Sequence, residues 1–421
     1  MTPIRLDLPN GLRIITEELP HIHSVAVGIY TKVGARYEAP RLSGVSHFLE
    51  HMLFKGTARR NARDISEAIE GVGGGLNAYT SFDSTVYYAK VADIHFDRAV
   101  DVLSDMLLNS LFDAKEIEKE RRVIIEEINM SLDQPAEWVH QMLDSLMWGE
   151  QPLGRDIAGT PESVAGLRRE DLLEYQRTHY TLPNTVISVA GNVSSTIMVD
   201  AWVKALGNYP AGSLHQPIPT LQPAPGARLS VLNKDTEQAN FCLGFPGLSF
   251  NDPDRRPLQV LDSVLGSGMS SRLFQEIREE RGLAYSVFSY TSEYDDAGKW
   301  VIGAGVETDK VHEAIRACLD ELGKLRDTGI TTEELQRVKE QVKGGMLLGM
   351  EDSGSVVRRN GSHVLRYGEI IPVEQVVAEI EAVTHEDVLR VAQRLIRPDA
   401  LHLAVIGPFA DQTPFEAALT L

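Results

Sequence analysis

The residues of this chain best suited to chemistry are 47–51, which read His-Phe-Leu-Glu-His. On an α-helix, residues four apart are neighbours on one face, so His47 and His51 can bind the same ion. Glu50 can approach that ion without serving as a ligand. Two histidine ligands beside a free carboxylate are the groups that metal-assisted peptide hydrolysis uses. The order His-x-x-Glu-His is the inverse of the commoner zinc-protease motif.

A helix is expected to carry these side chains. In residues 42–55, Ser43 is the expected N-cap and Gly56 follows the last apolar turn. A surface helix with two histidines would also explain the pattern. However, none of the other ten of the 12 histidines forms a pair with this spacing.

A catalytic zinc ion usually has three protein ligands and one open position, so a further ligand, expected to be a carboxylate, must come from a second element. Residues 114–133 predict a long helix, on which Glu120 and Glu127 are two turns apart along one face. Glu126 is a competitor, but it faces about 100° away from Glu127. A solvated acidic face remains the alternative interpretation of these glutamates.

Together these residues resemble the pitrilysin, or inverzincin, family of zinc peptidases. The resemblance implies that His47, His51 and Glu127 bind one zinc ion per chain. It also implies that Glu50 takes a proton from water and passes it to the leaving amine. Glu120, seven residues before the third ligand, is then expected to orient or support the site.

A segment in the second half, residues 270–288, extends the resemblance. Arg278 and Tyr285 have the seven-residue spacing of an arginine and a tyrosine in active members. The resemblance implies that they bind substrate and stabilise the oxyanion formed during hydrolysis. The alternative is a surface arginine and a core tyrosine, and Arg272 and Arg281 are weaker candidates for the arginine's role.

Residues 71–91 predict a glycine-rich turn followed by an edge strand and its partner. No Lys-Ser/Thr pair follows the glycines, which excludes a phosphate-binding P-loop. In the resembled family the corresponding strand binds the substrate backbone as an added β-strand. The resemblance therefore makes Asn77, Ala78 and Tyr79 candidate substrate-binding residues, with ordinary sheet structure as the alternative.

Composition narrows the class of protein. The 421 residues are 43% hydrophobic and 24% charged, as in ordinary globular proteins. The net charge of −19 argues against nucleic-acid binding, and no apolar run is long enough to cross a membrane. Cys242 and Cys318 are expected to be buried and unpaired. These features favour a protein of the reducing cytoplasm, and the resemblance to bacterial relatives implies a bacterial one.

The chain also repeats. Three positions recur at an offset of 216 residues: Gly28 and Gly244, Asp171 and Asp387, and Gly191 and Gly407. We therefore expect an α+β fold of two homologous domains, each a largely antiparallel sheet with helices on one face. The expected bounds are 1–208 for the zinc-bearing domain, 209–226 for a proline-rich linker, and 227–421 for a repeat without metal ligands.

The length resembles the half-length branch of the family, which includes the catalytic subunit of the mitochondrial processing peptidase and its bacterial relatives. Full-length members join two such half-molecules around a chamber. The resemblance therefore implies a homodimer whose active sites are completed in trans and which cleaves unfolded peptides. Two alternatives remain: a non-catalytic scaffold or peptide-binding subunit, and a chain that needs a distinct partner subunit.

Overall fold

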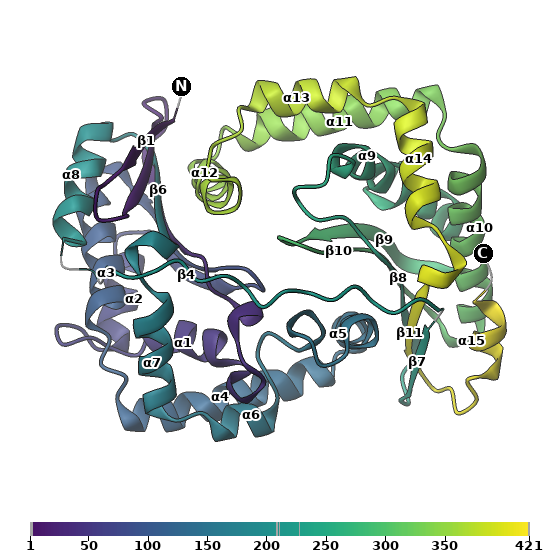
Figure 1. The fold of residues 1–421 in the computed structure, drawn as a ribbon, viewed down its shortest axis with the longest axis horizontal. Helices are drawn as coiled ribbons and strands as arrows, with labels where there is room; N and C mark the ends of the chain where they lie inside the picture. The colour runs from purple at the N-terminus through teal and green to yellow at the C-terminus, as the bar shows by residue number, and fades with distance from the viewer. Residues whose placement is uncertain (1–2, 208, 210, 227, 420–421) are drawn as a thin grey trace. The chain divides into compact units, whose positions relative to one another are not determined.

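The computed structural model describes residues 3–207, 209, 211–226 and 228–419. The chain forms two compact units, shown as a ribbon in Figure 1. The first unit comprises Met1–Ile128, Asp156–Ile218 and Met346–Ile371, and the second comprises Asn129–Arg155, Pro219–Gly345 and Pro372–Leu421. Neither unit is one continuous stretch of chain.

The first unit contains a six-stranded sheet with the order β1-β2-β6-β3-β5-β4. Its strands are β1 (Ile4–Asp7), β2 (Arg13–Glu18), β3 (Ser24–Thr31), β4 (Gly75–Thr80), β5 (Thr85–Ala92) and β6 (Thr185–Gly191). All neighbouring pairs are antiparallel except β2 and β6. Strand β4 lies at an edge of this sheet, as predicted.

Helices cover both faces of this sheet. One layer contains α1 (Val45–Leu53), α2 (Ala62–Glu70), α3 (Phe96–Asn109), α4 (Ala114–Leu132), α6 (Pro161–Gly166), α7 (Arg169–His179) and α8 (Ser195–Ala205). Val25, Val27 and Ile29 of β3 belong to the core on this side. The alternate residues Ala26 and Tyr30 pack with α12 (Ser353–Tyr367) on the other face.

The second unit repeats the plan with five strands in the order β7-β11-β8-β10-β9. These are β7 (Arg228–Asn233), β8 (Gln238–Pro246), β9 (Ala284–Glu293), β10 (Gly298–Glu307) and β11 (His402–Gly407). The helices are α9 (Arg255–Gly266), α10 (Val311–Thr328), α11 (Thr332–Gly349), α13 (Val373–Ala382), α14 (His385–Leu395) and α15 (Thr413–Ala418), together with α5 (Pro135–Trp148).

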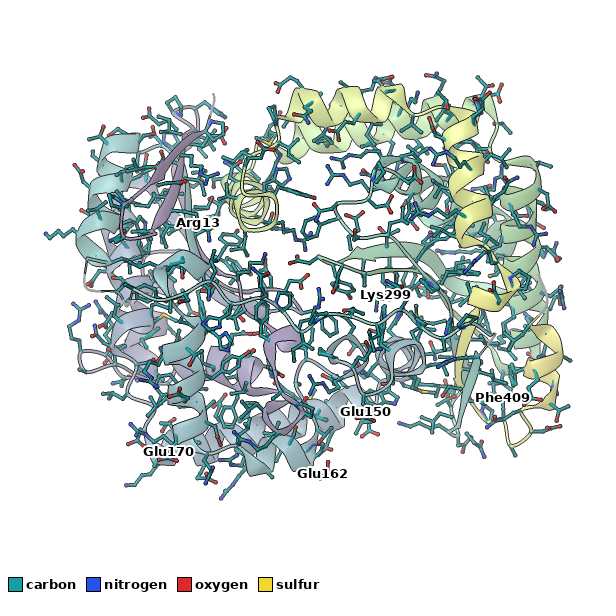
Figure 2. The ribbon with its side chains drawn as sticks, viewed as in Figure 1. Arg13, Glu150, Glu162, Glu170, Lys299 and Phe409 are labelled. Carbon is teal, nitrogen blue, oxygen red and sulfur yellow. The ribbon has the colours of Figure 1, made fainter. Side chains whose placement is uncertain are left out.

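A buried ion pair fixes α5 on the second sheet. Lys299 of β10, labelled in Figure 2, places its Nζ 2.5 and 2.7 Å from the two carboxylate oxygens of Asp144 on α5. Removing one partner would leave an uncompensated buried charge, so the loss of either side chain should be strongly destabilising. Thus α5 comes from the first half of the sequence but packs on the second sheet.

The comparison of the two units confirms the predicted α+β class and the two homologous repeats. Strands β3 and β8 occupy equivalent places, as do β6 and β11. The exchange of α5 and α12 between the two halves is not predicted by the sequence. It adds one helix to the face of each sheet that we expected to be bare.

The structure also bears on the expectations for the proline-rich segment, the two cysteines and membrane-spanning helices. Residues 211–226 of the proline-rich segment form no helix or strand. Cys242 and Cys318 are buried free thiols, as expected. Within the described ranges, no helix is long and apolar enough to cross a bilayer.

Candidate metal centre

The helix that carries the histidines begins at a glycine rather than at the predicted Ser43. The N-cap of α1 is Gly44, whose φ of 90° lies in the left-handed region that favours glycine. A Cβ at Gly44 would lie 2.4 Å from the Ala158 carbonyl oxygen. The buried Glu38 carboxylate instead accepts hydrogen bonds from the Gly44 and Ser46 amides, both 2.8 Å long. The prediction of Ser43 was therefore wrong, because a carboxylate from outside the helix caps it.

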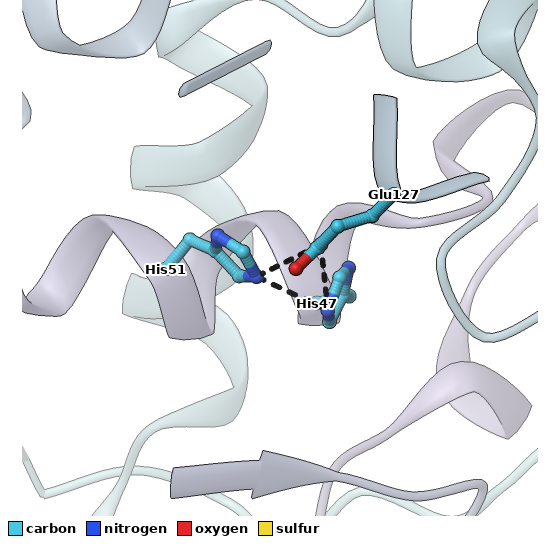
Figure 3. A group of neighbouring side chains, drawn as sticks. All are labelled: His47, His51 and Glu127. Carbon is cyan, nitrogen blue, oxygen red and sulfur yellow. Dashed lines mark hydrogen bonds and ion pairs between the residues drawn. The ribbon is translucent and has the colours of Figure 1, made fainter. Parts of the chain in front are cut away.

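Three predicted metal ligands meet at one point (Figure 3). The Nε2 atoms of His47 and His51 are 3.2 Å apart. An Oε2 of Glu127, on α4, lies 3.5 Å from Nε2 of His51 and 4.0 Å from Nε2 of His47. Glu126, the competitor in the sequence, is not part of this group. Among the described residues, this is the one group of three or more potential ligands with such spacing.

These separations fit a zinc ion. Two ligands bound tetrahedrally at about 2.0–2.1 Å lie about 3.4 Å from one another. The three observed distances bracket that value, so only small side-chain shifts are needed. The histidine side chains are 19% and 16% exposed and that of Glu127 is 47% exposed. The group is therefore open to solvent on one side, where a fourth ligand position can be reached.

Glu120 lies behind His51, where the sequence predicted a supporting role. Its Oε1 is 2.9 Å from Nδ1 of His51, and its Oε2 is 2.7 Å from Nζ of Lys55. An Nδ1 proton donated to Glu120 leaves the Nε2 lone pair of His51 facing the ligand group. Burial would raise the pKa of Glu120, but hydrogen bonds from His51 and Lys55 outweigh it and lower that pKa. Lys55 was not anticipated from the sequence.

His47 is held differently. Its Nδ1 is buried and has no hydrogen-bond partner among the described residues, so no second contact like that of Glu120 fixes its tautomer. Burial, with the neighbouring His51, lowers the pKa of His47 to about 4. The imidazole is therefore neutral at pH 7, which is the form that binds a metal ion.

Glu50 is close to the metal ligands, and its carboxylate is hydrogen-bonded to a residue of strand β4. Its Oε2 accepts a 2.6 Å hydrogen bond from the Thr80 hydroxyl, at the end of edge strand β4. Burial raises the pKa of the Glu50 carboxyl, although the Thr80 hydrogen bond opposes that shift. A raised pKa suits a general base that works near neutral pH. The sequence did not single out Thr80, which directly follows the three candidate substrate-binding residues.

The candidate substrate-binding residues lie on β4 as expected. The Asn77 side chain accepts a hydrogen bond from the Ala78 amide. Ala78 packs toward the core under α1, and Tyr79 is 39% exposed on the other face, with its ring centroid 6.3 Å from that of Tyr88. An edge strand offers free backbone groups to an added strand.

Arg278 and Tyr285 belong to the second unit, where they lie near each other. Arg278 is in a π-helical turn, Phe274–Glu280, of a kind that often occurs at functional sites. Its guanidinium carbon is 5.4 Å from the ring centroid of Tyr285, which is 78% exposed on β9. Because Tyr285 is exposed, the alternative interpretation of this residue as a core tyrosine is wrong. Arg272 is paired with Glu334, and Arg281 with Glu276.

Two family models match this chain, one after the other along the sequence. Residues 13–161 match the family model described as insulinase, peptidase family M16, and residues 166–342 match the peptidase M16 inactive domain. The ligand group lies wholly within the first match. Among the residues described in the second half, no comparable ligand group is present.

Similar proteins cover nearly the whole chain. An uncharacterized zinc protease of Streptomyces coelicolor is 42% identical over 97% of this chain and 90% of its own length. An uncharacterized zinc protease of Bacillus subtilis is 41% identical over 96% of this chain and 98% of its own length. A protease of Helicobacter pylori shares the fold, with a TM-score of 0.89, 23% identity, and coverage of 97% of this chain and 99% of that one. These findings confirm the resemblance drawn from the sequence: the chain belongs to peptidase family M16.

Proposed function

We propose that this protein is a zinc-dependent endopeptidase that cleaves unfolded peptides. The observation that carries the proposal is the meeting of His47, His51 and Glu127 at separations suited to one tetrahedral zinc ion. When bound, zinc lowers the pKa of a water molecule and polarises the carbonyl of the peptide bond. Relatives named as zinc proteases support the same reaction class.

The protein's own residues have separate roles in this reaction. Glu50 is not a metal ligand, and the Thr80 hydroxyl donates a hydrogen bond to its carboxylate. It accepts the proton of the attacking water and delivers it to the leaving amine. Glu120 is a positioning residue that acts through His51. Because Thr80 ends β4, one strand both positions the base and offers an edge to a peptide. A peptide added to β4 would therefore lie beside the proton acceptor.

We further propose that two copies form the active enzyme, each completing the other's site with Arg278 and Tyr285 inside a closed chamber. The side-by-side arginine and exposed phenol could hold a peptide backbone and an oxyanion. Mixing Glu50→Gln chains with Arg278→Ala/Tyr285→Phe chains, under conditions of subunit exchange, should restore activity in mixed dimers. Demonstrated exchange without recovered activity would overturn this arrangement. Two buried free thiols are consistent with a reducing compartment such as the cytoplasm.

The principal test uses the purified chain alone. We expect one zinc ion per chain by metal analysis, and hydrolysis of a flexible fluorogenic peptide that a chelator abolishes and added zinc restores. A non-catalytic scaffold would bind the peptide and not cleave it, with or without zinc. A chain that needs a distinct subunit would gain activity only when that subunit is supplied.

A further inference from the structure

A pocket of about 470 Å³ lies on the face of the first sheet opposite to the metal ligands. Residues of β3, β4, β5 and α12 line it, all within the first unit. Gly28 and Gly361 allow α12 to approach the sheet closely, because a Cβ at either position would come within 2.5 Å of the Tyr30 ring. The side chains that shape the pocket chemically are Tyr30, Tyr79, Tyr88, Lys90, Asp352 and Arg358.

Successive side chains of edge strand β4 point alternately toward the metal ligands and toward this pocket. Leu76 and Ala78 pack into the core beneath α1, and Thr80 bonds Glu50, so these residues face the metal side. Tyr79 points to the opposite face and lines the pocket. A peptide strand paired with β4 would alternate in the same way. Every second side chain near the scissile bond would therefore be directed toward the α12 face.

The charged side chains of the pocket are Lys90, Asp352 and Arg358. Lys90 Nζ lies 2.5 Å from Asp352 Oδ1, so these two charges offset each other. Arg358 is exposed, and its side chain forms no hydrogen bond or ion pair with any residue in the described ranges. The pocket therefore has one uncompensated positive charge, although the whole chain has a net charge of −19.

The tyrosines supply walls and donors around that charge. Tyr30 is nearly buried, while Tyr79 and Tyr88 are 39% and 38% exposed. Burial raises the pKa of the Tyr79 phenol, and the nearby Arg358 and Arg366 guanidinium groups oppose that shift. Burial also raises the pKa of Tyr30, so the Tyr30 and Tyr79 phenols are protonated at neutral pH. They can donate hydrogen bonds to an anion while their rings pack against methylene groups.

We infer that this pocket selects an acidic side chain, glutamate or aspartate, from a peptide bound along β4, and that Arg358 is the residue that determines this preference. The inference rests on the proposed function for the placement of the peptide. A guanidinium that lacks an internal partner is available for a charge-assisted bond with a carboxylate. A basic side chain in the same place would meet an uncompensated like charge.

The test scans one flexible fluorogenic peptide with Glu, Gln or Lys at each position on both sides of the scissile bond. At one position, the wild-type enzyme should cleave the Glu peptide with a kcat/KM about tenfold above that of the Gln peptide. Arg358→Gln should reduce this ratio to about one, and Arg358→Glu should make the Lys peptide the better substrate. Arg63→Gln, which removes one exposed positive charge outside the pocket, is the matched control and should preserve the preference.

A binding measurement separates this inference from the proposed function. The affinities of the same peptides for Glu50→Gln chains, with and without Arg358→Gln, are compared by fluorescence anisotropy. An Arg358-dependent preference for Glu in binding, without hydrolysis by the wild-type chain, would support the pocket and refute peptide hydrolysis by this chain alone. Hydrolysis with equal rates for Glu and Gln peptides at every position, or a preference that survives Arg358→Gln, would overturn the acidic pocket.

Discussion

Replacing Glu120 with glutamine should weaken zinc binding through a single contact. The carboxylate is 3% exposed and lies 2.9 Å from Nδ1 of His51, so it fixes the tautomer and direction of one ligand. Loss of such a partner typically costs 10–100-fold in metal affinity, or about 1.4–2.7 kcal/mol. The upper part of this range is expected here, because Lys55 would also lose its partner beside a divalent cation.

The assay is competition for zinc between the protein and a chromophoric chelator at fixed pH, with circular dichroism to confirm folding. Glu118→Gln is the matched control, since its side chain is 63% exposed on the same helix and pairs only with Arg121 among the described residues. Adding Lys55→Met to Glu120→Gln should recover part of the lost affinity. Equal zinc affinity in the Glu120 variant and the wild-type chain would refute the reasoning, as would an equal loss in the control.

Three other predictions concern ligand choice and stability. Glu127→Gln should lose zinc on dialysis while Glu126→Gln retains it, and equal metal contents would contradict this. Glu38→Gln should lower the free energy of unfolding in urea by about 1–3 kcal/mol, because α1 loses a charged cap; an unchanged midpoint would contradict this. Burial would raise the pKa of Asp105, but hydrogen bonds from Asn109, Thr57 and two arginines lower it. Its stabilisation is therefore present above the unfolded pKa of 3.8 and lost as pH falls through the folded value. Asp105→Asn should cost about 3 kcal/mol at pH 7 and progressively less as the pH falls below 3.8, and a constant difference would contradict this.

The ligand group could be predicted from the sequence because helix periodicity brings His47 and His51 together without tertiary information. Glu127 required the resemblance to a known family, since several glutamates share its helix. The same limit applies to Arg278 and Tyr285, whose spacing alone has no chemical meaning. The repeated fold was predictable because equivalent residues recur at a constant offset.

The remaining parts of the site depend on contacts between distant segments. Lys55 and Thr80 reach Glu120 and Glu50 only after the strand and helices have packed. The N-cap of α1 was mispredicted for the same reason. The capping carboxylate belongs to Glu38, which lies outside the helix, whereas the local sequence offered Ser43 as an ordinary N-cap residue. The exchange of α5 and α12 also leaves no local pattern, since an amphipathic helix does not specify which sheet it covers.

In the proposed mechanism, Glu50 accepts a proton beside a zinc ion that it does not bind. The most direct measurement compares zinc content and peptide hydrolysis in wild-type and Glu50→Gln chains. We expect equal zinc content and a fall in kcat of about 10²–10⁴-fold, because an amide cannot take a proton from water. A Glu50→Gln enzyme that cleaves the fluorogenic peptide at nearly the wild-type rate would contradict it.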